Sequence, residues 1–310
     1  MTMQRIATFD FGSNSLKLSI FEVVGGRPRL SKELREYCAI GEDVFANGAI
    51  SEEKGQEVEQ AISRLKERLQ PDDVILAAAT SSFRDAPNGE EMAERFSQTL
   101  GAPIPVLKGE DEAALLARGV LMERESTGPA AILDIGGGSV EVIHAEDHTI
   151  QKARSYDLGA ARLREKFCPT PDDQPHAQEA MRDMAKFIQR KLKHLDPLPE
   201  TTRLFGSGGG LTTLGGMIHR DNNHSGAVVT ADQIQQMLQV LAPITANAIV
   251  EQYGMPLKRA RIMVAGLMIA WTAMRQMGKS ELTVSWAGLR EGLAQQYLEQ
   301  QDSAAAPDNE

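Results

Sequence analysis

Two stretches of the sequence decide the fold: FDFGSNSLKL at residues 9–18 and LDIGGGSVEV at residues 133–142. They align without gaps, so that Asp10 falls on Asp134 and each Asp is followed by a glycine-containing turn. In both, an apolar strand leads into the turn and a second strand follows it. Two copies are too few for a solenoid. The repeat therefore predicts two homologous lobes, each presenting an Asp-x-Gly turn to a shared cleft.

The rest of the chain alternates strand and helix patterns, which is typical of α/β folds. Between the two stretches, residues 80–88 form a polar segment that predicts a loop. Strands are expected at residues 6–9, 16–24, 74–79, 130–133, 140–145, 203–205 and 282–285, and helices at residues 51–69 and 110–122, from residue 211 onward and at the end of the chain.

The length of 310 residues is about twice that of a typical domain. We expect a first lobe at residues 1–122 and a second at residues 123–300, with the last helix able to pack back on the first lobe. Residues 301–310 lack an apolar face, which predicts a disordered tail.

Charge and composition exclude several classes of protein. The chain has 33 Lys and Arg against 43 Asp and Glu, a formal net charge of −10, which argues against a nucleic-acid partner bound through an extended basic face. A locally positive cleft for phosphates is compatible with this charge. The longest apolar stretch, residues 261–275, is too short for a membrane span and predicts a buried core helix.

The compartment follows from two further observations. The N-terminus lacks the pattern of a signal peptide, and Cys38 and Cys168 stand far apart without CxxC spacing. We therefore expect a cytoplasmic protein with no membrane partner, no disulfide framework and no zinc site.

The glycine turns are candidate phosphate sites. Glycines let backbone N–H groups approach an anion without a Cβ in the way, and Gly136, Gly137 and Gly138 are followed by the hydroxyl of Ser139. A single turn of this kind is more often only a tight turn, but two matched turns indicate a phosphate cleft.

Two carboxylates flank the second turn. Asp134 ends the strand before it, and Glu141 lies on the strand after it. Mg²⁺ favours one or two protein carboxylates together with waters and substrate phosphates. The pair predicts a site for Mg²⁺ or another divalent cation such as Mn²⁺.

Six segments in order carry a resemblance to a known family: TFDFGSNSLKL, ATSSFRDAPN, LKGEDEAALLARGV, AILDIGGGSVEVI, DLGAARL and GSGGGLTTL. Together they resemble the Ppx/GppA family of exopolyphosphatases and guanosine pentaphosphate phosphohydrolases, in its short two-domain form. The resemblance implies a duplicated actin/Hsp70/sugar-kinase-like (ribonuclease H-like) fold of α/β class. It also implies a Mg²⁺-dependent hydrolase acting on acid anhydrides.

The resemblance assigns roles to individual residues. Glu112 of GEDEA matches the catalytic glutamate, which as general base takes a proton from the attacking water. Arg84 matches the arginine of the TxxxRxAxN segment, which stabilises charge on the transferred phosphoryl group. Without the resemblance, Glu112 is one of several carboxylates at a helix start, where the helix dipole favours them anyway.

Further roles concern metal and substrate binding. Asp134 matches the metal-binding aspartate and Glu141 the glutamate after the glycine turn, while the second glycine turn binds phosphate. The same resemblance makes Ser13 and Asn14 the phosphate loop of the first lobe. Additional substrate contacts are assigned to Lys17, Gly208 and Gly209.

Departures from the family pattern bear on substrate range. Relatives often carry Arg near the position of Cys38 or Ala39, and Gly210 replaces a frequent Thr in the third glycine turn. Lys108 replaces a small residue before Gly109.

The leading interpretation is release of orthophosphate from inorganic polyphosphate, conversion of pppGpp to ppGpp, or both, by a monomer or homodimer. The motif residues serve the phosphates and do not distinguish the two substrates. An ATP-dependent phosphotransferase of the same superfold, with GSGGGLTTL as the adenosine-side turn, is the first alternative. A non-catalytic sensor of polyphosphate or nucleotide is the second.

Overall fold

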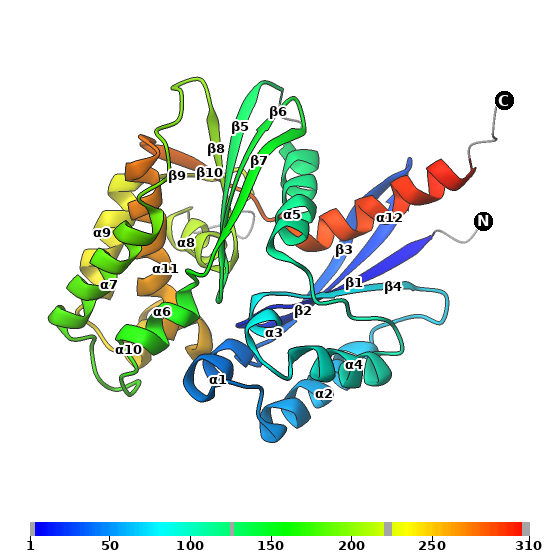
Figure 1. Ribbon diagram of the computed structural model, residues 1–310, viewed down its shortest axis with the longest axis horizontal. Coiled ribbons are helices and arrows are strands. Elements are labelled where there is room, and N and C mark those ends of the chain that lie inside the picture. Colours follow the sequence, from blue (N-terminus) through cyan, green and yellow to red (C-terminus); the bar gives the residue numbers. More distant parts are fainter. Residues whose placement is uncertain (1–3, 125–126, 220–224, 306–310) are drawn as a thin grey trace.

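Two β-sheets, one from each half of the chain, form the framework of the computed structural model, which describes residues 4–124, 127–219 and 225–305 (Figure 1). The strands are β1 (Arg5–Phe11), β2 (Leu16–Val24), β3 (Arg27–Glu36), β4 (Val74–Ala79), β5 (Pro129–Ile135), β6 (Val140–Glu146), β7 (Thr149–Tyr156), β8 (Arg203–Ser207), β9 (Val228–Thr230) and β10 (Glu281–Val284). The helices are α1 (Ile40–Asn47), α2 (Glu52–Lys66), α3 (Ser81–Asp85), α4 (Gly89–Leu100), α5 (Gly109–Arg124), α6 (Ala160–Phe167), α7 (Gln178–Leu192), α8 (Gly209–His219), α9 (Ala231–Leu241), α10 (Ala246–Tyr253), α11 (Leu257–Gln276) and α12 (Leu289–Ala305).

The two sheets repeat one arrangement. The first has the order β3-β2-β1-β4 and the second β7-β6-β5-β8-β10-β9. In each, three strands form an antiparallel meander, and the strand that enters it, β1 or β5, also pairs in parallel with a later strand, β4 or β8. The predicted duplicated actin-like α/β fold is confirmed.

The duplication extends to the register of the hairpins. In β1–β2, Asp10 lies opposite Lys17, and in β5–β6, Asp134 lies opposite Glu141. Residues directly opposite each other on antiparallel strands share a face of the sheet. Each strand-ending Asp therefore has one partner side chain across the ladder, a cation in the first lobe and a carboxylate in the second.

Helices cover both faces of each sheet. Helices α1, α2 and α4 pack on one face of the first sheet, and α12 covers the other through Ala294 and Leu298 against Ile6 and Phe21. Helices α6 to α11 pack on one face of the second sheet, and α5 covers the other. Helices α5 and α12 lie against each other between the sheets (Figure 1). The predicted lobe boundary falls near the end of α5 and stays a prediction.

The longest apolar stretch forms the core helix α11, which is buried along most of its length, so that prediction is confirmed. Cys38 and Cys168 are free and buried. Within the described ranges, no helix has the length and apolarity needed to cross a membrane.

Two details differ from the sequence pattern. The segment predicted as a loop contains α3, because Phe83 packs edge-on against Phe11 and Phe96 with ring centroids 6.2 and 6.1 Å apart. Such tertiary packing holds a five-residue helix that propensity alone does not signal. At the C-terminus, α12 continues to Ala305, five residues into the segment predicted to be disordered, and residues 306–310 lie outside the described residues.

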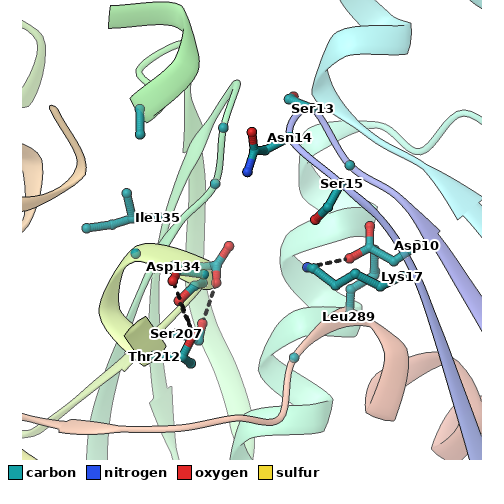
Figure 2. Close-up of a pocket in the computed structure, with 18 of the residues that line it drawn as sticks. Asp10, Ser13, Asn14, Ser15, Lys17, Asp134, Ile135, Ser207, Thr212 and Leu289 are labelled. Atoms are coloured by element: carbon teal, nitrogen blue, oxygen red, sulfur yellow. Dashed lines mark hydrogen bonds and ion pairs between the residues drawn. The ribbon is translucent and has the colours of Figure 1, made fainter. Parts of the chain in front are cut away.

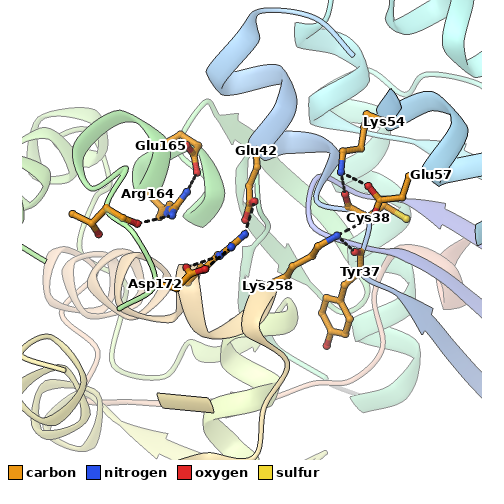
Figure 3. Close-up of polar contacts among 11 residues, drawn as sticks. Tyr37, Cys38, Glu42, Lys54, Glu57, Arg164, Glu165, Asp172 and Lys258 are labelled. Atoms are coloured by element: carbon orange, nitrogen blue, oxygen red, sulfur yellow. Dashed lines mark hydrogen bonds and ion pairs between the residues drawn. The ribbon is translucent and has the colours of Figure 1, made fainter. Parts of the chain in front are cut away.

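Ion pairs join the lobes beside the cleft (Figure 3). From α11, Lys258 contacts Glu57 of α2 at 2.9 Å and donates to the carbonyl of Tyr37 at 2.5 Å. Arg261, one turn later, contacts Glu42 of α1 at 3.2 Å. These contacts hold the start of α11 against the helices of the first lobe.

The crossing of α5 and α12 depends on glycine. A Cβ at Gly292 would lie 2.6 Å from the carbonyl carbon of Leu115, and one at Gly119 would lie 3.0 Å from the carbonyl carbon of Gly288. Backbone atoms are the neighbours in both cases, so the helices would have to separate.

Gly292→Ala should lower the free energy of unfolding by about 1–3 kcal/mol, as overpacking of a tight contact does. The matched control is Gly288→Ala, whose Cβ meets nothing within 4 Å. Thermal denaturation compares the two. Equal melting temperatures for the two variants would contradict the close crossing of the helices.

Candidate active site

A cleft with a volume of about 290 Å³ lies between the lobes (Figure 2). Four turns line it, at residues 12–15, 136–139, 207–210 and 286–290. The predicted site residues that line it are Ser13, Asn14, Lys17, Glu112, Asp134, Gly136, Gly137, Gly138, Ser139, Gly208 and Gly209. Arg84 and Glu141 do not line the cleft. They lie next to residues that do, Glu112 and Asp134.

The two repeated turns lie close to each other in the cleft. A Cβ at Gly137 would lie 2.9 Å from the Ser13 Cβ and 3.3 Å from the backbone nitrogen of Asn14. One at Gly138 would lie 2.6 Å from the Ser13 Oγ. Glycine is therefore needed here for the approach of the opposite lobe as well as for access by an anion.

Asn14 extends from the first turn toward the second lobe (Figure 2). Its side chain is buried, and neither its Oδ1 nor its Nδ2 has a hydrogen-bond partner. Buried polar groups are nearly always satisfied. An amide left open in a cleft is therefore a candidate ligand contact, in line with the predicted phosphate loop.

The start of α1 supports the first turn from behind. The Ala39 N–H donates to the Asn14 carbonyl at 3.1 Å, and the Gly41 N–H donates to the Ser13 carbonyl at 2.7 Å. Ala39 adopts a left-handed conformation with φ of 53° to do so. The segment in which relatives often carry Arg thus contributes backbone contacts to the turn, and its cysteine, Cys38, is buried.

Glu112 reaches the cleft from the first turn of α5. The Arg84 Nη1 donates to Glu112 Oε2 at 2.6 Å and to the Leu107 carbonyl at 2.7 Å. Arg84 therefore contacts Glu112 and does not line the cleft. Burial raises the pKa of Glu112 to about 7, and the nearby Asp134 and Asp10 add to this, while Arg84 opposes it. A carboxylate with a pKa near neutrality suits a general base.

Asp134 and Glu141 form the acidic pair of the second lobe. The Ser207 Oγ donates to Asp134 Oδ1 at 2.5 Å, and the Ser155 Oγ donates to Glu141 Oε1 at 2.7 Å. Glu141 is fully buried, and its Oε2 has no hydrogen-bond partner. Burial raises the pKa of both carboxyls, and the neighbouring Glu112 raises that of Glu141 further.

These residues fit a divalent cation. The described residues contain no cluster of three or more His, Cys, Asp or Glu side chains arranged around one metal position. Mg²⁺ does not need one, since it is commonly held by one or two carboxylates and otherwise by water and substrate phosphates. The unpartnered Oε2 of Glu141 is the kind of buried oxygen that a cation would satisfy.

The first lobe has a neutral counterpart of this pair. Lys17 Nζ contacts Asp10 Oδ2 at 2.9 Å (Figure 2). The ammonium faces the cleft with its charge balanced by the aspartate. The duplicated hairpins therefore supply a carboxylate pair on one side of the cleft and an ion pair on the other.

The third glycine turn meets an arginine. Gly208 has φ of +91°, and α8 begins at Gly209. The guanidinium of Arg259 lies against this helix start, so that a Cβ at Gly209 would lie 2.7 Å from its Cζ. A helix N-terminus attracts anions through its free N–H groups and its dipole, and Arg259 adds a full charge.

Arg259 is not neutralised within the described part of the chain. It is 5% exposed, has no carboxylate at ion-pair distance, and its Nε lacks a hydrogen-bond partner. Burial lowers the pKa of its guanidinium. A buried unpaired cation is costly, so an anionic ligand at this position would compensate it.

Sequence reasoning missed the arginines of the cleft, Arg35, Arg259 and Arg290. Arg290 donates to Ser19 at 2.5 Å and contacts Glu33 at 2.6 Å, which ties α12 to the first sheet. One signal was available for Arg259. The first turn of α11 carries several basic residues and no acidic one, the reverse of what the helix dipole favours.

The fold and the cleft together define a two-lobed enzyme of the actin-like class. Comparison with known proteins gives the family. The model of the Ppx/GppA phosphatase family matches residues 19–301. Because this match covers most of the sequence, the chain belongs to the Ppx/GppA phosphatase family, and the predicted class of enzyme, a hydrolase, is confirmed.

Individual relatives cover most of the chain. Exopolyphosphatase 1 of Mycobacterium tuberculosis is 28% identical over 97% of this chain and 90% of its own length. The guanosine-5′-triphosphate,3′-diphosphate pyrophosphatase of Vibrio vulnificus is 25% identical over 94% of this chain and 59% of its own length.

Solved structures show the same fold. A family member from Aquifex aeolicus has a TM-score of 0.79 at 24% identity and covers 97% of this chain and 99% of its own. An exopolyphosphatase from Cytophaga hutchinsonii has a TM-score of 0.83 at 22% identity, covering 96% and 98%.

If Glu141 binds Mg²⁺ as predicted, Glu141→Gln should remove the response of thermal stability to Mg²⁺, because a cation that binds only the folded state stabilises it. The variant should also melt higher than the metal-free wild type, since it no longer buries an uncompensated carboxylate. Glu146→Gln, at the exposed end of the same strand, is the control. Thermal denaturation with EDTA and with Mg²⁺ measures both effects. A full Mg²⁺ response in the Glu141→Gln protein would contradict the metal assignment.

Proposed function

We propose that this protein hydrolyses terminal phosphoanhydride bonds, releasing orthophosphate from inorganic polyphosphate or converting pppGpp to ppGpp. The observation that carries the proposal is the convergence of both repeated glycine turns and Glu112 on one cleft. The names of the relatives, exopolyphosphatase and guanosine-5′-triphosphate,3′-diphosphate pyrophosphatase, support it.

Substrate phosphates bind between the lobes. The N–H groups of the second glycine turn, the open amide of Asn14 and the start of α8 supply neutral donors. Arg259 supplies the unbalanced positive charge. Because these groups recognise phosphates and not a base, the same cleft accepts a polyphosphate chain or a nucleotide polyphosphate.

Asp134 of β5 and Glu141 of β6 would hold Mg²⁺. The bound ion would neutralise negative charge on the phosphate oxygens. Ser207 and Ser155 fix the two carboxylates by donating to one oxygen of each, which leaves the other oxygens to bind the cation.

Glu112 acts as the general base. It takes one proton from a water molecule as the water oxygen attacks the terminal phosphorus; the bond to the bridging oxygen breaks, and the shortened chain leaves with that oxygen. Arg84 holds the carboxylate in place through Oε2. Positioning and charge stabilisation supply most of the acceleration in phosphoryl transfer.

Glu112→Gln should reduce phosphate release by about 10²–10⁴-fold while leaving the fold intact, because the amide cannot accept the proton. Glu110→Gln, two residues earlier on the exposed side of the helix start, is the control. Phosphate release is measured on long polyphosphate, short polyphosphate and pppGpp, with and without Mg²⁺.

Three outcomes of this assay bear on the proposal. Unchanged release by the Glu112→Gln protein would remove Glu112 from the mechanism. Transfer of the phosphoryl group to an added acceptor, with no orthophosphate released when the acceptor is left out, would favour the phosphotransferase alternative. Tight binding by the wild type without any release would favour the sensor. The oligomeric state stays the prediction of a monomer or homodimer.

Arg259→Gln should raise KM for either substrate about tenfold or more, since a charged hydrogen bond is worth about 1.5–3 kcal/mol. Arg275→Gln on the exposed face of the same helix is the control. Steady-state kinetics measure the effect. Equal KM values for the two variants would show that Arg259 does not bind the substrate.

A further inference from the structure

The second glycine turn rests on the start of α6 through its carbonyl groups. The N–H of Ala160 donates to the Gly136 carbonyl at 3.0 Å, and the N–H of Ala161 donates to the Gly137 carbonyl at 2.8 Å. The third carbonyl, that of Gly138, accepts instead from a side chain, the Arg162 Nε, at 2.8 Å. Three successive carbonyls are thus tied to one helix, two by backbone and one by Arg162.

Arg162 is itself fixed by the first lobe. Its Nη2 forms an ion pair with Asp85 of α3 and lies 3.4 Å from the Ser81 Oγ. Its guanidinium also stacks on Phe45 of α1, 4.4 Å from the ring centroid. The side chain belongs to the second lobe, but most of the groups that orient it belong to the first.

Gly138 has particular need of this anchor. It has no side chain to restrict its backbone, and the peptide that follows it carries the N–H of Ser139. Because the C=O and N–H of a trans peptide point in opposite directions, holding the Gly138 carbonyl toward α6 directs that N–H away from α6. Rotation of this peptide would turn a carbonyl oxygen toward the place of the anion.

We infer that Arg162 is a positioning residue that couples closure of the lobes to the conformation of the phosphate-binding turn. When the lobes are together, Asp85 and Phe45 hold the guanidinium on the Gly138 carbonyl. When they part, the last peptide of the turn loses its anchor, while the two backbone anchors from α6 stay. The inference rests on the proposed function only in taking this turn to be a phosphate site.

Closure itself does not depend on Arg162 alone. The ion pairs of Lys258 with Glu57 and of Arg261 with Glu42 join the lobes independently. Loss of the Arg162 contacts should therefore weaken phosphate binding with little change in melting temperature. A merely structural role would show the reverse.

The test uses the affinity for tripolyphosphate, measured by calorimetry with Mg²⁺ in a Glu112→Gln background, so that hydrolysis does not consume the ligand. Arg162→Gln should weaken binding about tenfold, as loss of a charged hydrogen bond does. Asp85→Asn should weaken it in the same direction, although Asp85 belongs to the other lobe. Arg162→Lys should restore little, since an ammonium lacks the planar fork that serves several acceptors at once.

The double variant R162Q/D85N carries the decisive comparison. If the two residues act as one unit, it binds no more weakly than Arg162→Gln alone. Arg164→Gln is the control, because Arg164 lies two residues later on α6 and bonds to Glu165 and Thr170 of its own lobe. Additive losses in the double variant, or an Arg162→Gln protein that binds as well as the control, would overturn the inference.

Failure of the proposed function is separable from failure of this inference. Absence of phosphate release by the wild type would refute the hydrolase proposal. The binding measurements would still decide the role of Arg162, since they do not depend on turnover. In the active enzyme, the same variants should raise KM more than they lower kcat.

Discussion

The close approach of the two repeated turns is the constraint on which the rest of the site depends. Gly137 lies so near Ser13 and the backbone of Asn14 that a Cβ on it would push the two turns apart, and a Cβ on Gly138 would displace the Ser13 hydroxyl. Residues from β1, β5, α5 and α8 line the same cleft beside this contact. The contact also explains why the second turn has glycine at positions 137 and 138, where the first has Ser13 and Asn14. The first turn contributes the side chains of Ser13 and Asn14, and the glycines of the second turn leave space for them.

A charge difference at one aligned position of the repeated hairpins makes the two sides of the cleft electrostatically different. The two hairpins share a register, and only the residue opposite the strand-ending Asp differs in charge. In the first lobe, Lys17 neutralises Asp10. In the second, Glu141 faces Asp134 and leaves a buried oxygen without a partner. The two hairpins thus share a backbone arrangement but differ in charge. Only the carboxylate pair of the second lobe is suited to bind a cation.

The sequence predicted the architecture because the repeat is local: strand, Asp, turn and strand lie within ten residues. Asp134 was predicted in the cleft for the same reason, because it belongs to the repeat. Glu112 was singled out only by the family resemblance, since its helix start carries several carboxylates. The sequence did not predict that Arg84 lies on Glu112 rather than on the cleft surface, because that contact spans 28 residues and depends on the packing of Phe83. Arg259 was missed because an arginine within a basic run looks like surface, and its burial is visible only in the fold.

The net charge of −10 is compatible with a phosphate substrate because of how the positive charges of the cleft are paired. Asp10 offsets Lys17, and Glu33 is shared between Arg290 and Arg35, so each of these cations has a carboxylate partner. Arg259 is different, because it lacks a carboxylate partner in the described ranges and lies at a helix N-terminus. A protein with a negative net charge can therefore still attract a polyanion locally, in a cleft that holds a buried arginine without a carboxylate partner. Attraction of phosphate then depends on the position of the Arg259 guanidinium, which has no carboxylate partner, and not on the number of basic residues in the chain.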